Sequence, residues 1–216
     1  MDIHWNILDK QRCDLLPLLA ELSRDRFYLA GGTGLALQLG HRDSIDFDFF
    51  TKKDFDTIEL RQDIEQVFQG HGVKITQEKK NTISCLVDST VQLSFLGYAY
   101  SLQRPLLQTE HFPIASIEDI AGMKLSAITA RSLEKDYVDL YYILQHHSLK
   151  ELMAISQKKH PSLDFALVLK SLVYFDDIAH EPIMFKEGNE VTLEKLREFF
   201  QATVTQYLGE IQKELT

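Results

Sequence analysis

The sequence of 216 residues contains only two cysteines, Cys13 and Cys85, so it has few residues that could form disulfide bonds. Two isolated cysteines build neither a disulfide framework nor a zinc site, and such scarcity is typical of a reducing compartment. The chain is also long enough to bury a core of its own. We therefore expect a globular protein that folds without disulfides or a structural metal.

Long hydrophobic runs and an excess of positive charge are also missing. Asp, Glu, Lys or Arg interrupts every apolar stretch before it reaches the length of a membrane span, and no signal-like segment opens the sequence. These absences predict a soluble, cytoplasmic protein with no membrane partner. The formal net charge is -9, whereas broad nucleic-acid binding requires a basic face. A nucleic-acid substrate would therefore need a local basic rim.

The stretch 27–50, which reads FYLAGGTGLALQLGHRDSIDFDFF, carries the main functional pattern. Its first residues predict a strand, and Gly31-Gly32 then permits a sharp turn that a ligand can approach closely. Thr33 is expected to cap a helix from Gly34 to Leu39. Because the first-turn amides of a helix attract anions, Gly31, Gly32 and Thr33 are candidates for binding phosphate.

An alternating segment, 43–50, follows this helix. Its period of two predicts that Ile45, Phe47 and Phe49 face the core while Asp46 and Asp48 face the other side. At ~3.3 Å per residue the two carboxylates would lie roughly 7 Å apart. Such a pair suits Mg²⁺, which takes one or two carboxylates together with substrate phosphates. A surface hairpin with solvated aspartates is the alternative interpretation.

The glycine turn and the acidic strand together resemble a known superfamily. GGT followed by R-x-S-x-D-x-D is similar to the nucleotidyltransferase superfamily that includes DNA polymerase β, whereas P-loop and dinucleotide-binding motifs are absent. More narrowly, the chain resembles the abortive-infection toxins of the AbiEii/AbiGii type. The stretches that carry this narrower resemblance are VQLSFLGYAYSL, SIEDIAGMKLSAITARSLEKDYVDLYYIL and SLVYFDDIAHEPIM.

This resemblance implies an enzyme that moves a nucleotide from a nucleoside triphosphate to an acceptor with Mg²⁺ or Mn²⁺. It further implies the toxin of a toxin-antitoxin, phage-defence pair, with tRNA as a plausible acceptor and a cognate antitoxin as partner. A protein acceptor, or a non-catalytic nucleotide-binding or interaction module, are the alternatives. The residues that match the family's motifs are Asp46 and Asp48 for the metal, Gly31, Gly32, Thr33, Arg42, Ser44 and Lys124 for the nucleotide, and Lys124 with Asp139 or Asp136 for catalysis.

One feature of the superfamily is missing from the sequence. Two alternating runs, 82–87 and 91–96, predict a hairpin, and the second strand would be expected to bear a third metal carboxylate. The residues that face outward there are Gln92 and Ser94. Asp88, in the connecting turn, could replace them only in a different strand register.

A helix that starts at Ser116 carries Lys124 on its core side. Further charged residues that follow at helical spacing are Arg131, Lys135 and Asp139. A continuous helix would place them along one line with Lys124, whereas a break near Ser132 would keep both Asp136 and Asp139 as candidates. We favour Asp139. A surface ladder of ion pairs is the alternative interpretation.

The fold class that follows is α/β (α+β). We expect a small mixed sheet of the nucleotidyltransferase type, flanked by helices, in residues 1–115. Residues 116–216 would form a helical part that closes the cleft and does not fold independently. The helices that the apolar periodicity predicts outside the motifs are 5–24, kinked at Pro17, then 55–68, 149–158, 163–172 and 192–215.

Overall fold

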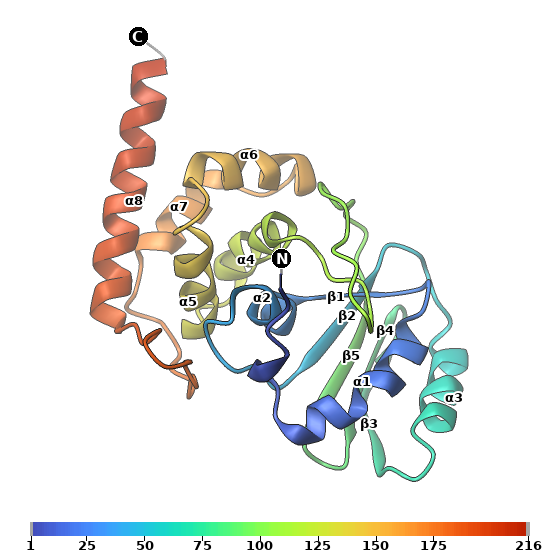
Figure 1. Cartoon of the computed structure of the whole chain (residues 1–216). Helices are drawn as coiled ribbons and strands as arrows, with labels where there is room; N and C mark the ends of the chain where they lie inside the picture. The colour runs from blue at the N-terminus through green and yellow to red at the C-terminus, as the bar shows by residue number, and fades with distance from the viewer. Residues whose placement is uncertain (1, 215–216) are drawn as a thin grey trace. The chain divides into compact units, whose positions relative to one another are not determined.

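The computed structural model describes residues 2–214, which form two compact units, Met1–Ser116 and Ile117–Thr216 (Figure 1). Leu215, the last residue of the predicted final helix, lies outside the described residues. The first unit contains a sheet and its helices, and the second is helical. The predicted α/β fold is therefore confirmed. The elements of the first unit are a 3-10 helix Trp5–Ile7, α1 Lys10–Ser23, β1 Tyr28–Ala30, α2 Gly31–Leu39, β2 Phe47–Thr51, α3 Thr57–Val67, β3 Val73–Lys79, β4 Thr82–Val87 and β5 Val91–Gly97.

The sheet of the first unit has five strands in the order β1-β2-β5-β4-β3. β2 pairs with β5 in parallel, and the other neighbours are antiparallel, so the sheet is mixed, as predicted. β2 lies between β1 and β5, where Asp48 is opposite Ala30 on one side and Ser94 on the other. The carboxylate of Asp48 is therefore carried by an inner strand with a fixed register.

One face of this sheet forms the core of the first unit. Phe47, Phe49 and Phe95 are fully buried in the same hydrophobic cluster as apolar residues of α1 and α3, the two helices that cover this face (Figure 1). Burying each such ring stabilises the fold by about 1.5–3 kcal/mol. Because side chains alternate along a strand, Asp48 and Ser94 project from the opposite face of the sheet.

The predicted helix over 5–24 is divided in two. Asp9 caps α1 by accepting a hydrogen bond from the Arg12 backbone N–H, and an extended Leu8 separates α1 from the preceding 3-10 helix. Pro17 lies inside α1, which continues past it to Ser23, so Pro17 does not interrupt the helix.

The predicted hairpin is confirmed by β4 and β5, which pair antiparallel. Asp88 lies in the connecting turn, where its carboxylate is 2.8 Å from His71 Nδ1 and accepts from the Gly72 N–H at 2.8 Å. These hydrogen bonds lower the pKa of Asp88. Since Ser94 rather than Asp88 is paired with Asp48, Asp88 does not supply the missing carboxylate.

The second unit is built from five helices, and its core is formed by residues such as Tyr137, Leu172 and Phe200. No helix among residues 2–214 is both long and apolar enough to span a bilayer. Both cysteines are free thiols, and burial raises the pKa of Cys85 to about 12. The helices of this unit are α4 Ile117–Ala130, α5 Glu134–Ile143, α6 Leu149–Lys159, α7 Phe165–Val173 and α8 Leu193–Glu214.

Candidate active site

The glycine turn of the first unit lies directly against the acidic strand. Gly31 follows β1, adopts φ +66° and is the first residue of α2. A Cβ atom placed on Gly31 would lie 3.2 Å from Asp48 Oδ2. Only a residue without a side chain both accepts this backbone conformation and leaves room for the carboxylate. Asp48 thus lies next to the start of α2, where the first backbone N–H groups have no partner within the helix.

Thr33 occupies a different position from the one expected. α2 begins at Gly31, its N-cap residue is Ala30, and no side chain caps it, so the prediction that Thr33 starts a helix at Gly34 was wrong. The buried Thr33 hydroxyl instead donates to the backbone carbonyl of Asp46 and lies 2.7 Å from Ser44 Oγ. The two glycines allow the helix to start earlier, and Thr33 ties α2 to the segment that precedes β2.

The alternating pattern also extended the acidic strand too far. β2 begins at Phe47, so Asp46 precedes the strand, and Ile45 is 56% exposed instead of facing the core. Phe47 and Phe49 are buried as predicted. The deviation arises because the segment before Phe47 pairs with no strand, so its side chains are not obliged to alternate.

Arg42 and Ser44 lie beneath the glycine turn. Arg42 is 6% exposed, and its Nη1 donates to the Asp43 carbonyl at 3.0 Å. A Cβ atom placed on Gly32 would lie 2.5 Å from Arg42 Nη2 and 3.7 Å from Ser44 Oγ. The guanidinium therefore brings positive charge against the backbone that the sequence predicts to hold phosphate.

The donor set suits a divalent metal shared with a substrate. Asp46 and Asp48 offer hard oxygen ligands, and the residue opposite Asp48 on β5 is Ser94, which is not a carboxylate. Across the described residues, no group of three or more His, Cys, Asp and Glu side chains is placed to hold a metal by itself. Mg²⁺ accepts such an incomplete set, because it is commonly held by one or two carboxylates and completed by phosphates and water. The residues present thus fit a metal that arrives with a triphosphate.

Replacing Gly31 by alanine tests the packing of the turn. The φ of +66° costs a side-chain-bearing residue about 1–2 kcal/mol, and the new methyl group presses on Asp48 Oδ2. We expect the rate of nucleotide transfer to fall about 100-fold, the effect of roughly 1 Å of misplacement. Gly209→Ala is the matched control, because a Cβ there meets nothing within 4 Å. Equal rates for the two variants would contradict the close approach.

The predicted residues of the second unit form a buried cluster. Lys124 on α4 is 5% exposed, and its Nζ lies 2.6 Å from Asp136 Oδ1 and 2.5 Å from Asp139 Oδ2. Both carboxylates are on α5 and have no exposed surface. Arg131, whose side chain is 54% exposed, joins the cluster from the solvent side with a 2.9 Å contact to Asp136 Oδ2. Two cations and two carboxylates therefore meet between α4 and α5, and their formal charges balance.

This arrangement corrects the geometry expected from spacing. The helix is not continuous, because α4 ends at Ala130 and α5 begins at Glu134, so a break near Ser132 is confirmed. The surface ladder was wrong: Lys124 is buried, and Lys135 pairs with Glu181 at 2.8 Å instead. Both aspartates contact Lys124, since positions three apart on α5 share a face.

The contacts of two buried cations, an ion pair and a hydrogen bond, gave no signal in the sequence. In the second unit, Lys159 on α6 pairs with Asp119 on α4 at 2.6 Å, and neither side chain is exposed. In the first unit, Arg12 is 5% exposed and its Nε donates to the Ile45 carbonyl at 2.8 Å. Both cations lie on amphipathic helices, where a single Lys or Arg reads as part of the solvated face.

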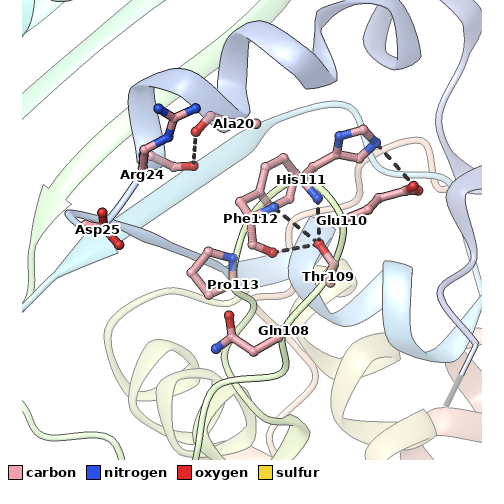
Figure 2. Close-up of a pocket in the computed structure, with 10 residues that line it drawn as sticks. Ala20, Arg24, Asp25, Gln108, Thr109, Glu110, His111, Phe112 and Pro113 are labelled. Atoms are coloured by element: carbon pink, nitrogen blue, oxygen red, sulfur yellow. Dashed lines mark hydrogen bonds and ion pairs between the residues drawn. The ribbon is translucent and has the colours of Figure 1, made fainter.

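A cavity of about 310 Å³ opens at another place in the first unit, between the end of α1 and the loop 108–113 (Figure 2). Within that loop, Thr109 Oγ1 accepts from the His111 and Phe112 N–H groups and donates to the Phe112 carbonyl at 2.7 Å. None of the predicted site residues is among those that line this cavity. Its shape therefore adds nothing to the site at the glycine turn.

Comparison with known families gives a match over most of the chain. The model of the family described as nucleotidyl transferase AbiEii toxin, type IV toxin-antitoxin system, matches residues 15–205. An uncharacterised protein of Aquifex aeolicus is 38% identical in a match of 192 residues, and the match covers 84% of this chain and 88% of that protein.

Solved structures show the same fold at low sequence identity. MenT4, a nucleotidyltransferase toxin of Mycobacterium tuberculosis, has a TM-score of 0.64 and 17% identity, over 90% of this chain and 82% of that one. JHP933 of Helicobacter pylori has a TM-score of 0.57 and 18% identity, over 96% of each chain.

Proposed function

Because this chain belongs to the AbiEii family of nucleotidyltransferase toxins, and is thus a nucleotidyltransferase, we propose that it transfers a nucleotide from a nucleoside triphosphate with the help of Mg²⁺ or Mn²⁺. The observation that carries the proposal is the contact of Asp48 with the glycine turn, where Asp48 Oδ2 would lie 3.2 Å from a Cβ on Gly31. A carboxylate and a helix N-terminus at one place offer opposite charges to a metal-triphosphate complex.

In this proposal the residues of the first unit bind and orient the triphosphate. The amides of Gly31, Gly32 and Thr33 hold phosphate oxygens, and Asp46 and Asp48 hold the metal. The metal, when bound, offsets the charge of the triphosphate and aligns it for in-line attack. Arg42 increases the positive potential at the turn, because its guanidinium lies against Gly32.

For Lys124, Asp136 and Asp139, family resemblance and structure support different roles. The resemblance assigns phosphate binding to Lys124 and assistance of the acceptor to an aspartate. The buried, charge-balanced cluster between α4 and α5 supports a contribution to the stability of the helical unit. The structure does not favour Asp139 over Asp136, because Lys124 contacts both.

We take the acceptor to be a macromolecule and the partner to be a cognate antitoxin, in a pair that serves phage defence. The family's place among type IV toxin-antitoxin systems supports the partner. tRNA is the acceptor that the family resemblance suggests. The formal net charge of -9 favours a protein acceptor instead, because an acidic chain repels an anionic RNA.

Labelling resolves the base and the acceptor together. The full chain is incubated with Mg²⁺, a total-cell extract and each of the four nucleoside triphosphates labelled at the α-phosphate. We expect label from one or more of them to enter a macromolecule, and removal of the metal with EDTA to abolish this transfer. Sensitivity of the product to ribonuclease identifies tRNA, and sensitivity to protease identifies a protein. Undiminished transfer in EDTA would refute the metal assignment, and no transfer from any triphosphate would refute the proposed function.

A further inference from the structure

Of the two aspartates assigned to the metal, only Asp48 is held by the sheet. Its backbone pairs with Ala30 of β1 and Ser94 of β5. Asp46 precedes β2 and takes part in neither ladder. Its position must therefore be fixed by other contacts.

Packing of the preceding side chain does not fix it, because Ile45 is 56% exposed, and the buried Phe47 holds the chain only on the other side of Asp46. The segment is instead tied to its surroundings by hydrogen bonds to the Ile45 and Asp46 carbonyl groups. Thr33 of α2 donates to the Asp46 carbonyl, and Arg12 of α1 donates from Nε to the Ile45 carbonyl at 2.8 Å. The peptide carbonyls on both sides of the Asp46 Cα are thus held, by residues from two different helices.

Arg12 is itself held from two further directions. Its Nη1 pairs with the Asp9 carboxylate, which also caps α1, and its Nη2 donates to the Thr90 carbonyl at 3.2 Å. Thr90 lies in the turn that leads into β5, the strand that places Ser94 beside Asp48. The guanidinium is 5% exposed and planar, so its three bonds fix the directions of the groups that they join.

We propose that Arg12 is a positioning residue for the metal-binding carboxylates. Through the Ile45 carbonyl it sets the backbone from which Asp46 projects, and through the Thr90 carbonyl it sets the start of β5. Arg12 touches neither substrate nor metal in this role. The inference rests on the proposed function, because it gives Arg12 a purpose in metal binding beyond the stability of the fold.

The test measures Mn²⁺ binding to the full chain by electron paramagnetic resonance, with a non-hydrolysable triphosphate analogue present and no acceptor. We expect Arg12→Met to weaken Mn²⁺ binding about 10- to 100-fold, as the loss of an outer-shell partner does. Arg12→Lys keeps the charge and reaches one carbonyl but not both, so it should recover part of the affinity. Lys10→Met, which removes an exposed pair with Asp14 on the same helix, should bind as the wild type does.

Leu19→Ala distinguishes a merely structural role, because it truncates a fully buried apolar side chain of α1 that cannot form a hydrogen bond to the segment. This variant should melt at a lower temperature yet bind Mn²⁺ with wild-type affinity. If Arg12→Met melts early but also keeps wild-type affinity, the positioning role is overturned. If Arg12→Met does not fold, Arg12→Lys provides the test in its place. Wild-type affinity for Mn²⁺ in that variant would contradict the proposal.

Asp48→Asn distinguishes this failure from failure of the proposed function. If the wild type binds Mn²⁺ and Asp48→Asn does not, while Arg12→Met binds normally, only the role of Arg12 falls. If the wild type itself binds no Mn²⁺ with the analogue, the metal assignment falls, and the role of Arg12 falls with it.

Discussion

Asp48→Asn is expected to lower the rate of nucleotide transfer about 1,000-fold or more. The amide keeps the shape of the side chain and removes its charge. A bound metal contributes several kcal/mol of charge stabilisation, and each ~1.4 kcal/mol is a factor of about ten in rate. The effect should be large because Asp48 carries one of two carboxylates assigned to the metal and lies against the Gly31 turn.

The measurement is the initial rate of label transfer, with circular dichroism and a thermal melt to establish that the variant is folded. Asp14→Asn is the control, since this aspartate is exposed and pairs with Lys10 on the surface of α1. Asp46→Ala should also abolish transfer and leave the fold intact. Near wild-type transfer by either folded variant would remove that residue from the site.

Lys124→Met is expected to lower the free energy of unfolding by about 3–5 kcal/mol, the cost of removing one partner from a buried ionic cluster. The methionine fills similar space but leaves Asp136 and Asp139, both without exposed surface, lacking their shared cation. Such a loss is a large part of the stability of an ordinary domain. The helical unit should therefore melt well below the wild type.

Urea unfolding, followed by the helical signal in circular dichroism, gives the comparison. Lys150→Met is the matched control, because Lys150 forms an ion pair with Glu214 on the surface of the same unit. The control should change stability by about 0–1 kcal/mol, as exposed ion pairs do. A Lys124→Met variant of wild-type stability that transfers no nucleotide would favour the phosphate-binding role over the structural one.

The sequence predicted the parts of the site that depend on interactions between residues close together in the chain. The turn at Gly31-Gly32, the burial of Phe47 and Phe49, and the hairpin at 82–97 follow from backbone freedom and alternation, and all are present. The sequence left undecided whether the helix is interrupted between α4 and α5, because residues 131–133 contain no glycine or proline that would force a break.

What the sequence missed depends on contacts between distant segments. Alternation placed Ile45 inward, because the pattern gives no sign that the strand starts only at Phe47. The Arg12 side chain reaches a carbonyl 33 residues further along the chain, and no periodicity of α1 indicates such a bond. The Thr33 hydroxyl likewise had two possible partners, and the tertiary contact with the Asp46 carbonyl replaced the local helix cap.

The parallel pairing of β2 with β5 has a consequence for the timing of synthesis. When β2 leaves the ribosome, its parallel partner β5 has not yet been synthesised. The elements α3, β3 and β4 come first, because they lie between β2 and β5 in the chain. Pairing between strands that are distant in sequence forms slowly, because a long loop must close, at a cost in chain entropy, before the strands can make stabilising contacts. A nascent chain that stops before Val91 thus lacks the strand that locks Asp48 in register. The face of the sheet that carries Asp48 is therefore incomplete until most of the first unit has been translated.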